Sequence, residues 1–207
     1  QAFGSPALWN TVVRWAEAND VERPFPTLKR ILSAGAPVPA ETLSKLRTLV
    51  DPDASIMTPY GSTEALPLAS IESREVISET GPASLKGKGT CVGTRFEGVS
   101  WRVIEIQDGP ITDIQETQEV DQGKIGELMV TGPMVTKTYV VRSDQNSLHK
   151  VTDGKRIWHR MGDIGYLDSR DRFWFCGRKA HRVTAGNRTL FTIPCEAIFN
   201  SHPAIYR

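Results

Sequence analysis

The stretch LKRILSAGAPVPAETLSKLRTLVDPDASIMTPYGSTE, residues 28–64, decides the fold of this 207-residue chain. Its apolar pattern predicts one strand over residues 28–32 and a second over residues 55–57. A helix between them begins at Pro39 and carries three apolar residues on one face: Leu43, Leu46 and Val50. Because two strands joined by a helix in this way run parallel, the stretch predicts an α/β sheet.

A short motif follows each of these two strands. Ser33-Ala34-Gly35-Ala36-Pro37 comes after the first strand, and Tyr60-Gly61-Ser62-Thr63-Glu64 comes after the second. The carboxyl ends of neighbouring parallel strands lie at one edge of the sheet, where open α/β proteins bind ligands. The two motifs are therefore expected to line one pocket, each from a loop.

The second motif has the chemistry of a nucleotide site. The Tyr60 ring can stack on a planar base, and Gly61 lets the backbone approach a ligand without a Cβ atom in the way. Thr63 offers a hydroxyl to a phosphate oxygen, and Glu64 offers a hard oxygen ligand to Mg²⁺. An ordinary polar turn after a buried strand is equally compatible with the pentapeptide taken alone.

Composition excludes several classes of protein. The net charge is +1 and the sequence has no basic run, which argues against a nucleic-acid surface. No apolar stretch approaches the roughly 20 residues of a membrane span. The three widely spaced cysteines, Cys91, Cys176 and Cys195, indicate free thiols in a reducing, cytoplasmic setting. The four histidines lack metal-binding spacing and are interpreted as surface or packing residues: His149, His159, His181 and His202.

The chain divides into three parts by texture. Residues 1–88 alternate helix and strand, with a first helix opened by Ser5-Pro6, and form an incomplete α/β subdomain. Residues 89–178 predict an antiparallel β subdomain, with a small barrel as one form of it. Its short strands are predicted over residues 100–106, 125–131, 156–161 and 172–176. Residues 179–207 are the truncated start of a third module, whose helix at residues 193–200 has few neighbours, so the chain is expected to be an internal piece of a longer protein.

A carboxylate between glycines is the next candidate. In Met161-Gly162-Asp163-Ile164-Gly165, the two oxygen atoms of Asp163 can accept hydrogen bonds from both hydroxyls of a ribose. Arg178, in Cys176-Gly177-Arg178-Lys179, can add a donor to that ribose or remain solvated. A Gly-Asp turn that closes a hairpin is the commoner role of such a sequence in isolation.

Five motifs in a fixed order together resemble the adenylate-forming superfamily of acyl-CoA synthetases, luciferases and adenylation domains. They are Ser33–Pro37, Pro59–Ala65, Gly126-Glu127-Leu128 to Gly132-Pro133, Gly162-Asp163 and Gly177-Arg178. The resemblance implies the C-terminal part of the large N-terminal domain of such an enzyme, followed by the start of its lid domain. It also implies a nucleotide site for ATP or AMP formed by Gly35, Ala36, Pro37, Tyr60, Gly61, Ser62, Thr63, Asp163 and Arg178. In that site Thr63 and Glu64 act in catalysis, and Glu64 holds Mg²⁺.

Two longer runs, residues 60–67 and 173–183, resemble the branch that makes β-lactones in bacterial long-chain olefin biosynthesis. Those enzymes adenylate a β-hydroxy acid, whose own hydroxyl then displaces AMP, so that no CoA is needed. Two alternatives stay open: a fatty acyl-CoA ligase, which uses CoA, and a non-catalytic nucleotide-binding module.

The resemblance also implies a hinge at Lys179 and Ala180, after which the lid rotates. The phosphate loop and catalytic lysine of the superfamily are expected outside these 207 residues, so the chain alone is expected to be inactive. The expected partner is a small-molecule acyl substrate. A homo-oligomer and an assembly with other enzymes of the pathway are both left open.

Overall fold

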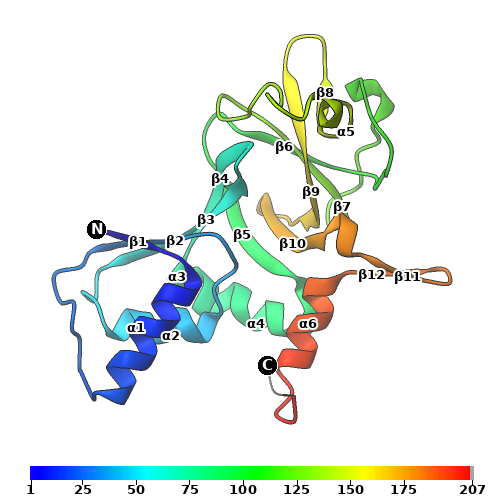
Figure 1. Cartoon of the computed structure of the whole chain (residues 1–207). Helices are drawn as coiled ribbons and strands as arrows, with labels where there is room; N and C mark the ends of the chain where they lie inside the picture. Colours follow the sequence, from blue (N-terminus) through cyan, green and yellow to red (C-terminus); the bar gives the residue numbers. More distant parts are fainter. Residues whose placement is uncertain (206–207) are drawn as a thin grey trace.

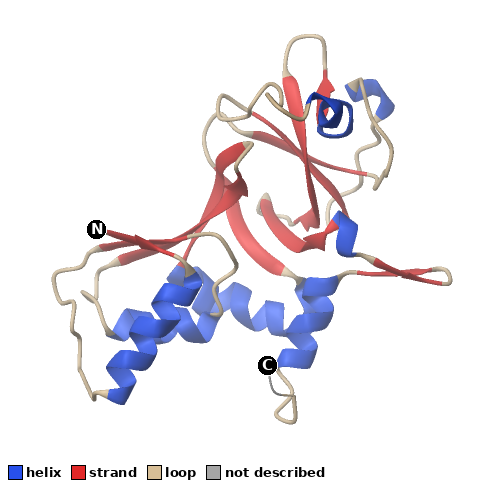
Figure 2. Cartoon of the chain, in the orientation of Figure 1, coloured by secondary structure: helices blue, strands red, loops and turns tan. Residues whose placement is uncertain are grey.

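A continuous ten-stranded sheet runs through most of the chain in the computed structural model, which describes residues 1–205 (Figures 1 and 2). The spatial order is β1-β2-β3-β4-β5-β10-β9-β7-β6, and β8 pairs with β9. The strands are β1 (Ala2–Gly4), β2 (Arg30–Ser33), β3 (Ser55–Ser62), β4 (Ala65–Glu72), β5 (Thr90–Arg95), β6 (Ser100–Ile104), β7 (Gly126–Thr131), β8 (Lys150–Thr152), β9 (Ile157–Leu167) and β10 (Arg172–Arg178). A separate hairpin is formed by β11 (Val183–Ala185) and β12 (Arg188–Leu190).

Six α-helices accompany the strands in the described part of the chain. They are α1 (Pro6–Ala18), α2 (Ala40–Thr48), α3 (Ser73–Glu75), α4 (Gly81–Ala83), α5 (Asn146–His149) and α6 (Thr192–Asn200). Wide helical turns over residues 76–80 and 84–88 extend α3 and α4 into one irregular helical segment. Within residues 1–205, no helix combines the length and the hydrophobicity that crossing a membrane requires.

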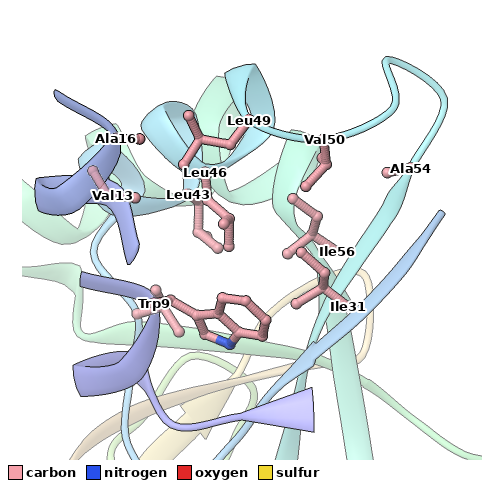
Figure 3. Close-up of a cluster of buried hydrophobic side chains, with 11 residues drawn as sticks. Trp9, Val13, Ala16, Ile31, Leu43, Leu46, Leu49, Val50, Ala54 and Ile56 are labelled. Carbon is pink, nitrogen blue, oxygen red and sulfur yellow. The ribbon is translucent and has the colours of Figure 1, made fainter. Parts of the chain in front are cut away.

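The two strands that the sequence predicts to be parallel are β2 and β3. Ile31 of β2 lies opposite Ile56 of β3, and β1 adds a third strand beside β2. Helix α1 begins where predicted because the Ser5 hydroxyl accepts the amide of Leu8 and Pro6 occupies its first turn. The apolar faces of α1 and α2 pack on this part of the sheet (Figure 3). The cluster includes Trp9, Val13, Ala16, Ile31, Leu43, Leu46, Leu49, Val50, Ala54 and Ile56.

The antiparallel strands belong to the same sheet, which corrects the prediction of a barrel. Strand β3 pairs in parallel with β2 and, on its other side, antiparallel with β4. From β4 onwards each strand pairs antiparallel with its neighbours, and the strand path stays open, with β6 at its end. Strand β3, which has a parallel neighbour on one side and an antiparallel neighbour on the other, therefore joins the parallel part of the sheet to the antiparallel part.

The pentapeptide motif is not a loop, contrary to the prediction. Strand β3 continues through Tyr60 to Ser62, and the turn consists of Thr63 and Glu64 before β4 returns. Gly61 permits this close hairpin, because a Cβ atom there would lie 2.5 Å from the carbonyl oxygen of Ala65. In this structure Gly61 therefore allows the two strands of the hairpin to lie close together, rather than a ligand to approach the backbone.

Asp163 also lies inside a strand, so the alternative of a Gly-Asp turn that closes a hairpin is wrong. Strand β9 was predicted to end at residue 161, yet it continues to Leu167. Its interior glycine Gly165 allows close packing, since a Cβ atom there would lie 2.1 Å from the carbonyl oxygen of Trp174 on β10. Of the two glycines that suggested a turn, Gly165 is therefore a site of close contact within the sheet, whereas Gly162 has open space around it and a positive φ of 65°.

The C-terminal helix α6 has neighbours. It packs against the helical turn over residues 84–88 and against β10, as its position beside α4 in Figure 1 also shows. Gly87 makes room for it, because a Cβ atom there would lie 3.0 Å from Cδ1 of Ile198. The expectation that this helix has few neighbours is therefore wrong.

Candidate nucleotide site

Three of the predicted site residues meet at the centre of the sheet, although 103 positions separate the first two. The Tyr60 hydroxyl donates to Asp163 Oδ2 at 2.5 Å. An Arg178 nitrogen lies 2.7 Å from Asp163 Oδ1 and forms an ion pair with it. The sheet thus joins residues from β3, β9 and β10 in one cluster, which we call the Asp163 cluster.

Strand register explains why Arg178 lies beside Asp163. Arg178 lies directly opposite Asp163 in the β9–β10 pair, after a register shift between Phe175 and Gly177. Each of the two charged residues follows a glycine with positive φ, 65° at Gly162 and 133° at Gly177. Because non-glycine residues avoid this region of φ, the glycines allow the local bends that bring the two side chains together.

Burial controls the electrostatics of the Asp163 cluster. Burial raises the pKa of Asp163, and the hydrogen bond from Tyr60 and the charge of Arg178 oppose that rise. Burial also raises the pKa of Tyr60 well above its usual value, and the neighbouring Asp163 charge adds to this effect. The phenol therefore stays protonated and donates to the carboxylate.

The Asp163 cluster retains unused binding capacity. A carboxylate has about four lone-pair positions, of which Tyr60 and Arg178 use two. The Asp163 side chain is 4% exposed, whereas that of Arg178 is 52% exposed. A buried acceptor beside an accessible cation suits a ligand that presents several hydroxyl groups.

Glu64 lies in a second polar group at the β3–β4 turn. Burial raises the pKa of Glu64, but hydrogen bonds from its own backbone and from Ser62, together with the charge of His159, outweigh burial and lower it. Its carbonyl oxygen accepts the amide of Thr136 at 2.8 Å. Glu64 is therefore held as a carboxylate.

Sequence reasoning missed the neighbours of Glu64. Burial raises the pKa of Tyr139 to about 12, with further contributions from the charge of Glu64 and a hydrogen bond to it. Burial lowers the pKa of His159 to about 4, and the charge of Lys150 adds to this effect. No local signal in the sequence marked Lys150 as a neighbour of this turn.

The remaining predicted residues lie near these groups to different degrees. Ser62 Oγ is 3.9 Å from Sδ of Met161, which places the end of β3 beside β9. Thr63 is exposed in the turn. Gly35, Ala36 and Pro37 form an exposed loop after β2, and within residues 1–205 no hydrogen bond joins this loop to the Asp163 cluster.

The proposed hinge is anchored by a buried ion network. Lys179 Nζ lies 2.9 Å from both carboxylate oxygens of Glu127 and 3.0 Å from the carbonyl oxygen of Gln107. Arg160, fully buried, donates to the same carboxylate at 2.7 Å. Ala180 follows Lys179 in a short helical turn over residues 179–181. The hinge role itself stays a prediction.

The residues at the β3–β4 turn fit Mg²⁺ in one particular way. In residues 1–205 no three carboxylate, histidine or cysteine side chains gather as a metal site. Mg²⁺ commonly binds through one or two carboxylates together with substrate phosphates and water. A single ionised Glu64 meets that requirement, provided that a nucleotide supplies the phosphate oxygens.

Comparison with known proteins decides the family. Residues 2–140 match the family described as AMP-binding enzyme. The chain belongs to this family. Over its full length it is 42% identical to an olefin beta-lactone synthetase of Xanthomonas campestris and 40% identical to one of Stenotrophomonas maltophilia. It spans 37% of the length of each of these relatives.

Solved structures agree with the fold. O-succinylbenzoate coenzyme A synthetase from Bacillus subtilis, solved in complex with ATP and a magnesium ion, has a TM-score of 0.73 with this chain. The alignment covers 99% of the chain and 37% of that enzyme, at 20% sequence identity. The mixed fold expected from the superfamily resemblance is thereby confirmed.

Proposed function

We propose that the protein carrying this chain activates a β-hydroxy carboxylic acid with ATP and converts it to a β-lactone. The single observation that carries the proposal is the Asp163 cluster, in which superfamily motifs 103 positions apart form one polar site. Identity of 40–42% to two olefin beta-lactone synthetases along the whole chain supports the β-lactone product. A long-chain acid is the favoured substrate for the same reason.

The proposed reaction has two displacements. An oxygen of the substrate carboxylate attacks the α-phosphorus of ATP, and pyrophosphate leaves to give an acyl-AMP. The β-hydroxyl oxygen of the same molecule then attacks the acyl carbonyl, loses its proton, and displaces AMP as the lactone ring closes. Because the second attack is intramolecular, its effective concentration is high and no thiol acceptor is required.

Each site residue has a proposed part in holding ATP. Asp163 accepts the ribose hydroxyls, and the Arg178 guanidinium beside it adds a donor. The ring of Tyr60 faces the base, and residues 35–37 flank it. Gly61 and Ser62 complete the strand under the nucleotide, as the superfamily resemblance implies.

The β3–β4 turn takes the phosphate end. Thr63 contacts a phosphate oxygen, and Glu64 holds Mg²⁺, which offsets phosphate charge. Replacing Glu64 by Gln keeps its shape and removes the charge, so adenylation should fall while the fold is kept. Wild-type activity of that variant at limiting Mg²⁺ would assign Glu64 to the turn alone.

One experiment separates the proposed product from its rival. The full-length protein is given ATP and a long-chain β-hydroxy acid, with and without CoA, and the products are identified by mass spectrometry. A β-lactone formed without CoA supports the proposal, whereas an acyl-CoA formed only with CoA supports a fatty acyl-CoA ligase. Nucleotide binding with neither product would indicate a non-catalytic module.

One further feature bears on the cellular setting that we propose. Cys91 and Cys176 are buried free thiols, and Cys195 is a partly buried one, which suits a cytoplasmic enzyme. The partner we propose is the acyl substrate, with self-association or assembly with other enzymes of its pathway as the possible quaternary arrangements.

A further inference from the structure

Lys150 is linked to the β3–β4 turn through one residue. Its ammonium donates to the carbonyl oxygen of Thr136 at 2.7 Å and to Oγ1 of Thr136 at 3.0 Å. The amide of Thr136 in turn donates to the carbonyl oxygen of Glu64 at 2.8 Å. Ala65, which follows Glu64, and Val135, which precedes Thr136, form an antiparallel bridge. The two segments are therefore held in fixed register.

The charge of Lys150 is not cancelled by a close carboxylate. Within residues 1–205 no acidic side chain lies at ion-pair distance from it, although the residue is only 9% exposed. Its ammonium lies 5.4 Å from the centre of the Tyr139 ring. Burial lowers the pKa of Lys150, and the charge of Glu64 opposes this change, which places the ammonium in the electrostatic field of that carboxylate.

A cation fixed beside a metal ligand affects a metal ion and a metal–nucleotide complex differently. It repels a free divalent cation, and the burial of the ammonium reduces the screening of that repulsion by solvent. Phosphate oxygens bring negative charge that both the metal and the ammonium attract. The same lysine thus disfavours the metal alone and tolerates the metal with its nucleotide.

We propose that Lys150 makes metal binding at Glu64 depend on the nucleotide. The inference rests on the proposed function, in which Glu64 is the protein ligand of Mg²⁺. Lys150 is a positioning residue in this scheme, since it acts through its charge and through Thr136. The result is a site that stays empty of metal until ATP arrives.

The first test follows metal binding to the full-length protein without nucleotide. Mn²⁺ takes the oxygen sites of Mg²⁺ and broadens nearby NMR signals, so the amides of Glu64 and Ala65 report even weak binding. In Lys150→Met and Lys150→Gln, the Mn²⁺ concentration that halves these signals should fall about fivefold or more. Lys150→Arg should match the wild type. Lys155→Met is the matched control, because Lys155 is an exposed lysine in the β8–β9 turn.

The direction of the change in Mn²⁺ concentration distinguishes an electrostatic role of Lys150 from a purely structural one. If Lys150 only braces the turn, its neutral variants should need more Mn²⁺, and that result overturns the inference. An unchanged concentration in both neutral variants overturns it as well. Two variants are used because Gln retains a donor for Thr136 if Met disturbs the fold, and amide dispersion reports folding in each.

The second test uses the full-length protein with ATP. Bound Mn²⁺ is counted by electron paramagnetic resonance with and without ATP, and the gain in affinity on adding ATP should shrink about fivefold in Lys150→Gln. An equal gain in wild type and variant contradicts the inference. Glu64→Gln distinguishes the two proposals: if Mn²⁺ still binds beside residue 64 in that variant, the metal assignment of the proposed function fails, whatever Lys150 does.

Discussion

Two buried carboxylates in the same sheet have opposite surroundings. Glu127 is fully buried and contacts two cations, Arg160 and Lys179, which are themselves 0% and 17% exposed. Asp163 is nearly as buried, but its partners are a phenol and an arginine that is half exposed. The Glu127 carboxylate is held by two cations from within the protein, which is typical of a structural group. The Asp163 cluster opens to solvent through Arg178, which suits the ligand-binding role that we propose for it.

The largest effect is expected when the buried network of Glu127, Arg160 and Lys179 loses its carboxylate. Glu127→Ala leaves two cations without their carboxylate in the interior, which should lower the free energy of unfolding by about 3–5 kcal/mol. Urea denaturation followed by circular dichroism measures this change. Glu119→Ala, which removes an exposed partner of Arg102, should change stability by less than about 0.5 kcal/mol. Similar losses of stability in the two variants would contradict a structural role for the buried Glu127 network.

A smaller loss is expected for Lys179. In Lys179→Met the carboxylate of Glu127 keeps Arg160, so only one charged partner is lost and the cost should be about 1–3 kcal/mol. Hydrogen exchange should also speed up over residues 179–182, because Lys179 fixes the start of this segment. A cost as large as that of Glu127→Ala would show that Lys179, rather than Arg160, neutralises the carboxylate.

Replacing Asp163 should have a small effect on stability and a larger effect on ligand binding, the reverse of what is expected for Glu127. Asp163→Asn keeps the side-chain shape and an acceptor for Tyr60, and removes a charge that burial disfavours, so stability should change by less than about 1 kcal/mol. AMP binding to the full-length protein should weaken about tenfold or more, because hydrogen bonds to a charged acceptor are lost. Calorimetric titration measures the affinity. An unchanged AMP affinity in this variant would contradict a ligand-binding role for Asp163.

The pH dependence gives the smallest and most specific signal. Since burial raises the pKa of Asp163 in the folded state, its charge opposes folding at pH values above that raised pKa. This penalty should shrink as the pH falls through the folded pKa toward the unfolded value of about 3.9. The wild type should therefore gain stability relative to Asp163→Asn on acidification through this window. The difference between the two proteins isolates Asp163 from carboxylates such as Asp168, whose pKa is lowered.

Local pattern was enough to predict the parallel strands and α1. Ser5-Pro6 and the spacing of Leu43 and Leu46 act over a few residues, and such short-range signals survive in the fold. Motif order was enough to bring Tyr60 and Asp163 to the same site as a hypothesis. Their direct contact depends on the strand pairings that lead from β3 through β4, β5 and β10 to β9, which no local pattern encodes.

What could not be predicted depends on residues distant in sequence. The strand through Tyr60–Ser62 forms because β4 pairs with it, and few apolar residues mark that region. Lys150 carries no motif, and it reaches the β3–β4 turn only because residues 135–136 lie beside that turn. The same holds for Arg160, whose partner Glu127 comes from another strand.

The contact between Tyr60 and Asp163 has a consequence for the order of folding. Closing a loop of about a hundred residues carries an entropy cost that neighbouring contacts do not have, so the β2–β3 pair and the β9–β10 hairpin are expected to form earlier. Strand β3 then meets β9 only after β4, β5 and β10 have fallen into place between them. The Asp163 cluster is therefore among the last features to form, and its appearance marks a finished sheet.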